Sequence, residues 1–472
     1  MGGTPASPGA AADAIESEVL QRVRPDAEQL RQVSEVCQRL VERATTVARE
    51  QRFPLVRCLV AGSAARSTFL RDRLDLDFFL LFPPTLPRPE LERMGLALGE
   101  LILSKTETRY AEHPYRRGQF EGFTVDAVPG YAIEDPSHPL TAVDRTPFHN
   151  AYLLAHQTPS MVDHVILTKQ FLRALGIYGS EARKGGFSGY LVELLVLKFQ
   201  TLRQLLEEAR AWRIPVRLLS RPNAAPRVPE DVALVLDDPV DADRNVATAL
   251  TRRNLALFIL AAGEYLQRPR AESFTPVDLP HPGQAEAIKW LKVRQTHVGV
   301  LALPRPAAVD DILYPQLRKA ERAVAEEATR LGFRVFGTAS AAGGKEVLVL
   351  LEVDHVDLPG VRVQEGPPAG IDRTGDYLAK WSDPRQPVLQ GPYVGSDGRL
   401  MVDVRREERR LEPLLSAALD RLPLGKDLRD GLSPQARFLP LDEVPGSPHL
   451  DEALGELLAK RLPWIAPRVP SG

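Results

Sequence analysis

The chain has 472 residues, of which 44% are hydrophobic and 26% are charged, and its 60 basic and 62 acidic side chains leave a net charge of −2. This ordinary globular composition excludes the collagen-like, disordered and disulfide-rich classes, and the length predicts roughly three domains. The weak net charge excludes a protein that coats nucleic acid through a large positive field, but it allows a local basic groove.

The N-terminal segment, the apolar runs and the cysteines indicate in which compartment the protein resides. Residues 1–14 have neither the positive nor the apolar region of a secretory signal and are predicted to form a disordered leader. No window approaches about 18 uninterrupted apolar residues, so we expect a soluble protein without a membrane span. Cys37 and Cys58 are the only cysteines, which excludes a disulfide framework and a cysteine-based zinc site. A cytoplasmic location is therefore expected.

The first third of the chain has a mixed pattern. Apolar residues at helical spacing over 15–50, interrupted by Pro25, predict two amphipathic helices in series. Short apolar runs then predict strands over 55–61, 76–82 and 123–128, with a helix over 90–105 between two of them. This order indicates a small α/β domain over residues 15–155.

The rest of the chain divides in two. Residues 156–270 are mainly helical, with helices expected over 162–175, 190–212 and 245–265. A stretch typical of a linker, PVDLPHPG at 276–283, lies near the start of an α+β region over 271–472. In that region we expect strands over 295–304, 334–338, 345–353 and 400–405, and helices over 314–331 and 450–462.

The most informative segment is LVAGSAARSTFLRDRLDLDFFLLF, residues 59–82. A strand leads into Gly62 and Ser63 at an apparent helix start, where free N–H groups and close backbone approach suit the phosphates of a nucleotide. A second strand carries Asp75 and Asp77, whose side chains point to the same face because they are two residues apart. Paired carboxylates on a rigid strand suit Mg²⁺ ions that clamp a triphosphate.

A third carboxylate, Asp126, lies within the strand FTVDAV. An acid inside an otherwise apolar strand is costly unless it is paired or metal-bound. Asp126 is therefore either a further metal ligand or an ion-pair partner at the end of a strand. Asp-x-Asp alone is weak evidence, since Asp241 and Asp243 repeat it without a strand pattern.

Together these residues resemble the nucleotidyltransferase superfamily typified by DNA polymerase β. The resemblance narrows to the archaeal-type, class I, CCA-adding tRNA nucleotidyltransferases through the runs YAEHPYR, AVDRTPFH, GGFSGYL, DPVDADRN and GPYV, in this order along residues 15–460. It implies an α+β multidomain fold with a polymerase-β-like nucleotidyltransferase head over 15–155, a helical central domain over 156–270 that completes the nucleotide pocket, and an α+β tRNA-binding body and tail over 271–472.

The resemblance also implies roles for individual residues. Asp75, Asp77 and Asp126 match the catalytic carboxylates that bind two Mg²⁺ ions, and Asp126 matches the one suited to draw the proton from the RNA 3′-hydroxyl. The other matching positions contact the nucleotide: Gly62, Ser63, Arg66, Lys169 and Tyr178 at the triphosphate, Thr146 at the ribose, His149 as a further contact, and Arg244 at the incoming base.

Each nucleotide-contacting residue also has a purely structural explanation. Lys169 could be a solvated lysine on a helix, and Tyr178 could pack in a turn. His149 could be a hydrogen-bonded structural histidine, and Arg244 could be an ion-pair partner of Asp241. Without the family resemblance, these structural explanations would be favoured for all four residues.

The activity implied is untemplated addition or repair of the 3′-terminal CCA of tRNA from CTP and ATP, with release of pyrophosphate. The acceptor stem and T arm of the tRNA would contact the C-terminal region, and a homodimer is possible. Two alternatives stay open: another RNA nucleotidyltransferase of the superfamily, of the oligo- or poly(A) type, and a tRNA-binding protein whose catalytic head has lapsed.

Overall fold

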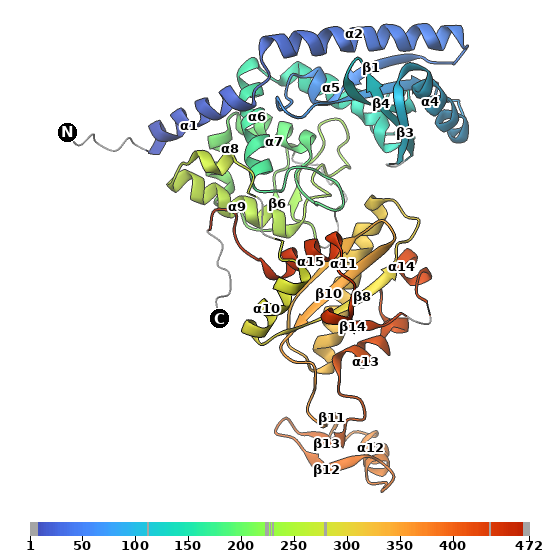
Figure 1. Cartoon of the computed structure of the whole chain (residues 1–472), viewed down its shortest axis with the longest axis vertical. Coiled ribbons are helices and arrows are strands. Elements are labelled where there is room, and N and C mark those ends of the chain that lie inside the picture. The colour runs from blue at the N-terminus through green and yellow to red at the C-terminus, as the bar shows by residue number, and fades with distance from the viewer. Residues whose placement is uncertain are drawn as a thin grey trace, which may run out of the picture. The chain divides into compact units, whose positions relative to one another are not determined.

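The structure is a computed structural model that describes residues 8–110, 113–221, 226, 228, 231–277, 281–433 and 436–465. The chain forms two compact units (Figure 1). The first comprises residues 1–278 with the short segments 309–311 and 462–464, and the second comprises the remainder. The head and the helical central domain expected from the sequence therefore lie together in the first unit.

The head is built on a five-stranded sheet with the order β1-β2-β5-β4-β3. Its strands are β1 (Arg57–Ala61), β2 (Asp75–Phe82), β3 (Ser104–Tyr110), β4 (Pro114–Phe120) and β5 (Phe123–Tyr131). Only β2 and β5 pair in parallel. The sequence predicted β1, β2 and β5 but not β3 or β4, because SKTETRY and PYRRGQF lack the apolar alternation of a half-buried strand.

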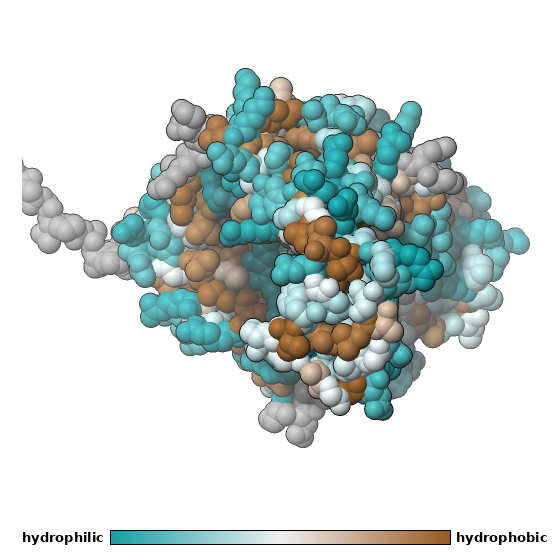
Figure 2. All heavy atoms as spheres, turned by 90° about the horizontal axis from the view of Figure 1, so that it is seen from below, coloured by the Kyte–Doolittle hydropathy of each residue, from teal (hydrophilic) through white to brown (hydrophobic). Residues whose placement is uncertain are grey.

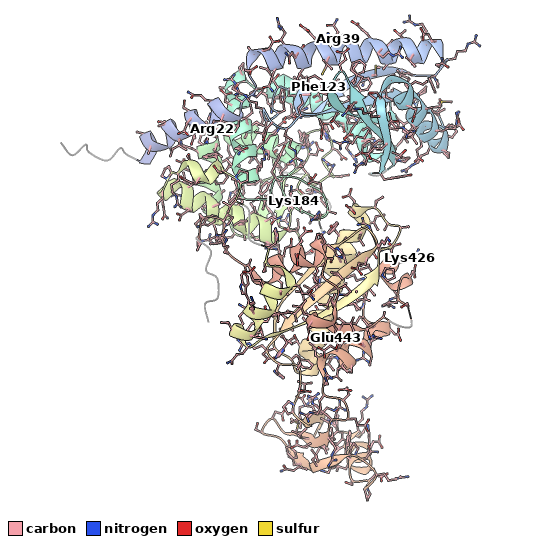
Figure 3. All side chains as sticks on the ribbon, in the orientation of Figure 1. Arg22, Arg39, Phe123, Lys184, Lys426 and Glu443 are labelled. Carbon is pink, nitrogen blue, oxygen red and sulfur yellow. The ribbon has the colours of Figure 1, made fainter. Side chains whose placement is uncertain are left out.

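Two helices pack with the head sheet in one apolar core: α2 (Ala27–Glu50) and α4 (Arg88–Ile102). Leu40 of α2 and Leu98 of α4 are fully buried in this core. Arg39 of α2 also forms an ion pair of 2.7 Å with Glu121, in the turn before Phe123 (Figure 3). This exposed ion pair adds little stability. Burial of the apolar side chains therefore contributes most of the free energy that holds α2 against the sheet.

The central strand β2 lies between β1 and β5, and its two faces are buried in two different apolar clusters. Leu76, Phe78, Leu80 and Phe82 belong to the core that contains α2 and α4, whereas Phe79 and Leu81 belong to a second cluster with Ala61 and Val128. Since strand residues alternate between faces, Asp75 and Asp77 lie on the face of Phe79 and Leu81.

The predicted disordered leader over residues 1–14 is wrong for its second half, because helix α1 extends over Pro8–Val23. The segment AAADA favours a helix, and the side chain of Ala12 is buried in the core of the central domain. The structure describes nothing of residues 1–7. The helix propensity of this segment and the packing of Ala12 therefore account for the ordered second half of the predicted leader.

The helical part of the first unit consists of helices that surround one large core. The helices are α5 (Thr146–His156), α6 (Pro159–Ala174), α7 (Gly189–Phe199), α8 (Leu202–Ala209) and α9 (Arg252–Gln267), with a two-stranded parallel ribbon of β6 (Val216–Arg217) and β7 (Leu234–Val235). The single helix predicted over 190–212 is broken at Gln200, which has a φ of +68°. The helix predicted from residue 245 starts only at Arg252, where Thr251 caps it.

The second unit contains two separate sheets. One has the order β14-β8-β10-β9, and the other has the order β11-β13-β12. The strands are β8 (His297–Pro304), β9 (Val335–Ala342), β10 (Glu346–Val353), β11 (Val361–Pro368), β12 (Val388–Val394), β13 (Arg399–Arg405) and β14 (Phe438–Pro440); the longer helices are α10 (Gln284–Arg294), α11 (Asp310–Leu331), α12 (Thr374–Trp381) and α15 (Pro448–Leu458).

The strands of the smaller sheet were only partly predicted. β13 has a clear apolar alternation, with Leu400, Val402 and Val404 buried. β11 and β12 instead expose several apolar side chains, among them Val363 and Val394. Figure 2 shows hydrophobic residues (brown) among hydrophilic ones (teal) on one face of the molecule. The edge strands β11 and β12 pair only with β13, so their sequences need not alternate strictly.

Candidate active site

The three acidic residues singled out in the sequence lie on two adjacent strands. Asp75 and Asp77 begin β2, and the parallel register places Asp77 directly beside Asp126 of β5. Directly paired residues of a sheet point to the same face. The three carboxylates therefore share the face of the head sheet that α2 and α4 leave uncovered.

Gly62 fixes the position of Asp77 from the neighbouring strand. It follows β1, whose last residue Ala61 pairs with Asp77, and it begins the one-turn helix α3 (Gly62–Ala65). Its φ is +69°, a conformation that side chains rarely adopt, and a Cβ at this position would overlap Oδ2 of Asp77. The glycine of the Gly-Ser pair is therefore required by close approach of the backbone to a carboxylate.

The acids repel one another. Burial, together with the charges of Asp126 and Asp75, raises the pKa of Asp77 to about 6. Burial likewise raises the pKa of Asp126 to about 6, although Arg117 opposes this shift. Oδ1 of Asp126 is buried and has no hydrogen-bond partner. Such clustered carboxylate oxygens are ligands that a hard divalent cation prefers.

Arg117 of β4 supplies positive charge to these acids. Its Nη2 donates to Oδ2 of Asp75 at 2.7 Å, and its Nη1 lies 3.6 Å from Oδ2 of Asp126. Among the described residues, no group of three His, Cys, Asp or Glu side chains is close enough to hold a metal ion as it stands. The three carboxylates fit a divalent cation in their chemistry, while Arg117 occupies one oxygen of Asp75.

A buried ionic group lies where the head meets the central helices. Glu193 of α7 accepts hydrogen bonds from Arg66 at 2.6 and 3.2 Å and from the hydroxyl of Thr68 at 2.8 Å. Lys169 of α6 lies 3.2 Å from the same carboxylate and also donates to Oγ1 and the backbone carbonyl of Thr68. Burial opposes ionisation of Glu193, but Lys169 and Arg66 hold its pKa below the usual value.

A second polar cluster lies at the loop after β7. The carboxylate of Asp238 is fully buried, and it accepts hydrogen bonds from His149 Nε2 at 2.8 Å, Arg244 Nη1 at 2.7 Å and the hydroxyl of Tyr190 at 3.0 Å. The rings of His149 and Tyr190 stack with centroids 4.1 Å apart. One carboxylate thus joins α5, α7 and the DPVDADRN loop.

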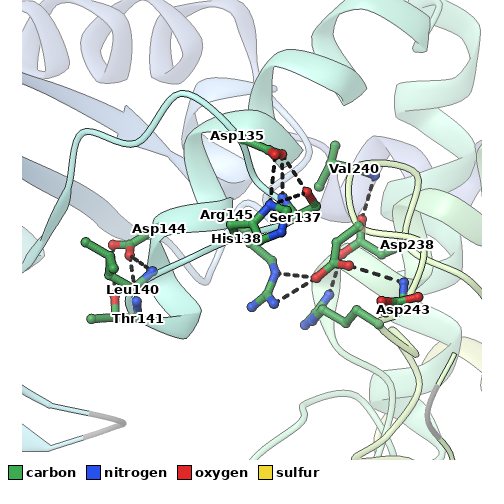
Figure 4. A network of polar contacts seen from close by, with 12 residues as sticks. Asp135, Ser137, His138, Leu140, Thr141, Asp144, Arg145, Asp238, Val240 and Asp243 are labelled. Atoms are coloured by element: carbon green, nitrogen blue, oxygen red, sulfur yellow. Dashed lines mark hydrogen bonds and ion pairs between the residues drawn. The ribbon is translucent and has the colours of Figure 1, made fainter. Parts of the chain in front are cut away.

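The remaining predicted nucleotide contacts are partly buried and border these groups. Thr146 begins α5, just after a capping box in which Asp144 accepts from the backbone N–H of Thr141 at 2.6 Å (Figure 4). The hydroxyl of Tyr178 lies beside Gly189, at the start of α7, where a Cβ would be 3.3 Å from it. Ser63 follows Gly62 in α3. Arg66, Lys169, Tyr178 and the start of α7 therefore form one neighbourhood.

Three family models match consecutive parts of the chain. They are a nucleotidyltransferase domain over residues 47–149, the second domain of tRNA nucleotidyltransferase over 163–275, and the C-terminal domain of the CCA-adding enzyme over 294–438. The CCA-adding enzyme of Haloarcula marismortui is 35% identical over 437 residues, which cover 89% of this chain and 92% of the relative. That of Methanothermobacter thermautotrophicus is 36% identical, over 95% of this chain and 98% of the relative.

The chain belongs to the CCA-adding enzyme family. It is a nucleotidyltransferase that adds CCA to tRNA, and its substrates are tRNA and nucleotides. The predicted α+β architecture with a nucleotidyltransferase head is confirmed. Divalent metal use follows from the family. Among the described residues of this CCA-adding enzyme, no helix is both long and apolar enough to cross a bilayer.

Two of the structural explanations weighed for single residues are wrong. Lys169 is not a solvated lysine, because its side chain is only 2% exposed. Arg244 does form an ion pair, but its partner is Asp238 and not Asp241, which instead pairs with Arg145 at 2.7 Å. His149 is hydrogen-bonded, as its structural explanation required.

Sequence reasoning missed four residues of this CCA-adding enzyme: Arg117, Tyr190, Glu193 and Asp238. Glu193 was detectable, since an acid in the apolar helix GYLVELLVLKF is costly unless paired. Tyr190 lies within the quoted run GGFSGYL, and Asp238 begins the run DPVDADRN. Nothing in the sequence indicated Arg117, because its strand was not predicted.

Proposed function

We propose that Asp75, Asp77 and Asp126 of this CCA-adding enzyme bind two Mg²⁺ ions at the reaction centre. The observation that supports this most directly is the parallel register of Asp77 with Asp126, whose Oδ1 is buried without a partner. When bound, the ions would neutralise charge on the triphosphate and favour in-line displacement at the α-phosphate. Arg117 would release Asp75 when they bind.

The protein groups then hold the reactants. Asp126 takes the proton from the tRNA 3′-hydroxyl, which attacks the α-phosphate of CTP twice and then of ATP, and pyrophosphate leaves each time. Gly62 admits close approach of the β/γ-phosphates, and Ser63 donates a hydrogen bond to them. Such catalysis consists of positioning and charge stabilisation without a covalent enzyme intermediate.

Arg66, Lys169 and Tyr178 are proposed to contact the triphosphate. In support, Arg66 and Lys169 carry two positive charges against the single negative charge of Glu193, which leaves the group with an excess of one positive charge. An anion that arrives beside them would balance this excess, and Lys169 would exchange one of its protein acceptors for a phosphate oxygen. Tyr178 would add a neutral hydroxyl donor.

The nucleoside end of the substrate is assigned to the second cluster. We propose that Thr146 contacts the ribose, that His149 forms a further nucleotide contact, and that Arg244 reads the base together with the backbone of the RNA. In support, the side chain of Arg244 is 37% exposed although one of its nitrogens pairs with a fully buried carboxylate. The acceptor stem and T arm of the tRNA would contact the second unit through backbone shape.

The test uses the full-length protein, Mg²⁺ and a tRNA that lacks its 3′-terminal CCA. We expect CTP alone to extend the tRNA by two residues, and CTP with ATP to extend it by three. Asp77→Ala should abolish both products. A ladder of a single repeated nucleotide would instead indicate an oligo- or poly(A)-type enzyme, and full activity of Asp77→Ala would refute the proposed site.

We further propose a cytoplasmic location, since tRNA, CTP and ATP are available there.

We also propose that the protein forms a homodimer. Sedimentation equilibrium of the full chain, with and without tRNA, measures its molecular mass. A mass of 52.2 kDa at all concentrations would correspond to a monomer and would refute the dimer.

A further inference from the structure

Asp238 is surrounded by donors. Its Oδ2 accepts from His149 and Arg244, and its Oδ1 accepts from Tyr190. Oδ1 also accepts from the backbone N–H of Val240 at 3.1 Å (Figure 4). The side chain has no solvent exposure. A buried carboxylate with four donors keeps a single orientation, because any rotation would leave buried donors unpaired.

This arrangement also defines the state of His149. Burial alone would raise the pKa of Asp238, but its donors hold it at about 2, so the group is a carboxylate at neutral pH. Burial lowers the pKa of His149, which favours the neutral ring. A neutral ring that faces a carboxylate through Nε2 must donate from that atom, so its Nδ1 carries a lone pair. The stacked ring of Tyr190 limits rotation of the imidazole.

The same carboxylate restrains Arg244. A free arginine side chain samples many rotamers, and ordering it costs free energy when a ligand binds. Here Nη1 of Arg244 is held at 2.7 Å by Asp238, while 37% of the side chain stays exposed. The guanidinium is therefore oriented before the nucleotide arrives, and Asp238 engages only one of its terminal nitrogens.

We propose that Asp238 is the positioning residue for nucleotide selection, since it holds Arg244 and His149 in one arrangement that favours CTP and ATP over UTP and GTP. The inference rests on the proposed contacts of Arg244 and His149 with the nucleotide. Asp238 itself touches neither substrate nor metal in this scheme; it acts through the two side chains that it orients.

The same loop provides a control. Asp241 is also buried, and it forms an ion pair with Arg145 at 2.7 Å, but its side chain contacts neither Arg244 nor His149. Asp241→Asn therefore removes a comparable buried charge from the same loop and should lower stability without altering selection. Tyr190→Phe removes only one hydroxyl donor of Asp238 and leaves the ring stack intact.

The experiment measures kcat and KM for all four nucleotides in the wild type and in D238N, Y190F, D241N and R244Q, with Mg²⁺. One tRNA lacks CCA, and the other lacks only the final A. D238N should raise KM for the correct nucleotide. The ratio of kcat/KM for the correct nucleotide to kcat/KM for UTP or GTP should fall on the order of tenfold. Y190F should act in the same direction but less, and D241N should leave the preference unchanged.

The outcomes separate selection from folding. A loss of folded protein lowers kcat equally for all nucleotides and leaves their ratios unchanged, so unchanged ratios in D238N and Y190F would overturn the inference. If R244Q changes the ratios and D238N does not, only the inference about Asp238 fails. If R244Q leaves the ratios unchanged, the proposed role of Arg244 fails, and this inference fails with it.

Discussion

Gly62 is the residue on which the position of Asp77 depends most directly, so it offers a sharp test of the catalytic geometry. Gly62→Ala would place a Cβ against Oδ2 of Asp77 and displace that carboxylate. A misplacement of about 1 Å can reduce a rate on the order of a hundredfold. We expect a loss of this size in kcat, measured as CMP incorporation at saturating CTP.

Gly122→Ala is the matched control for this substitution. Gly122 has a φ of +86°, so alanine causes a similar backbone strain, but nothing lies within 4 Å of the added Cβ. Both variants should lose a comparable amount of stability in urea. Similar loss of activity in both variants would show that strain in the head, and not the contact with Asp77, is responsible.

Under the proposed metal site, Arg117 would compete with a divalent cation for the acids that it contacts. Its guanidinium occupies Oδ2 of Asp75 at 2.7 Å, so Arg117→Gln should free that oxygen and tighten metal binding several-fold. The affinity for Mn²⁺ can be measured without turnover, by following the concentration of free Mn²⁺ with electron paramagnetic resonance during a titration.

The neighbouring residue tests whether this effect is local. Arg116 lies on the opposite face of β4, where it contacts Thr108 at 2.8 Å and Glu100 at 2.9 Å. Arg116→Gln removes the same charge from the same strand, and we expect unchanged Mn²⁺ affinity. Equal tightening in both variants would indicate a general electrostatic effect of the head.

At the scale of elements, the start of helix α7 connects stability to substrate binding. Ser188 caps α7 by accepting from the N–H of Leu191, and Gly189 beside it lies next to the hydroxyl of Tyr178. Ser188→Ala should cost about 1 kcal/mol of unfolding free energy. It should also raise KM for ATP, because the first turn of α7 borders the proposed triphosphate site.

Helix α8 has a cap of the same kind. Thr201 accepts from the N–H of Gln204, and this end of α8 contains no predicted nucleotide contact. Thr201→Ala should lower stability by a similar amount, measured by urea unfolding, and leave KM unchanged. A rise of KM in both variants would assign the effect to loss of helix stability in general.

The edge strands show why some strands could not be predicted from the sequence. β3 and β11 each pair with only one neighbour, and most of their side chains are exposed. Their sequences therefore carry few apolar residues in alternation, which is the main sequence signal of a strand. β2 and β10, which lie inside their sheets, are dense in Leu, Val and Phe, and both were predicted.

At the scale of the whole molecule, the acids make stability depend on pH and metal. The pKa values of Asp77 and Asp126 are raised from 3.8 to about 6. Because the folded value exceeds the unfolded one, each acid stabilises the metal-free protein below about pH 4 and loses this contribution as pH rises through about 6. Asp77→Asn should therefore gain stability relative to the wild type as pH rises.

Differential scanning calorimetry from about pH 4 to pH 6, between the unfolded and the folded pKa values, measures this trend in Tm. Without metal, the advantage of Asp77→Asn over the wild type should grow with pH, since only the wild type ionises at this position. With Mg²⁺ the wild type should gain the higher Tm, because the ion binds the ionised acids. A difference in Tm that is independent of pH would contradict the assigned pKa.

The sequence was sufficient to place the three clustered acids on one face and insufficient to identify the side chains that surround the candidate site. Asp75, Asp77 and Asp126 lie on strands with strong apolar patterns, and Gly62 directly follows such a strand, so the common face of the acids followed from periodicity alone. The partner of Arg66 did not, because Glu193 lies 127 residues away on helix α7 and approaches only through tertiary packing. The pairing of Arg244 with Asp238 is local to one loop, but it has no periodic signal because neither residue lies on a helix or a strand.

The buried group of Arg66, Lys169 and Glu193 constrains how such proteins can be recombined. Its members come from α6, α7 and the segment after α3, so a chimera with the head of one relative and the helices of another inherits them from two parents. A parent with a different partner at any position would leave a charge buried and unpaired, at a cost of about 3–5 kcal/mol. The three positions therefore have to be exchanged as a set.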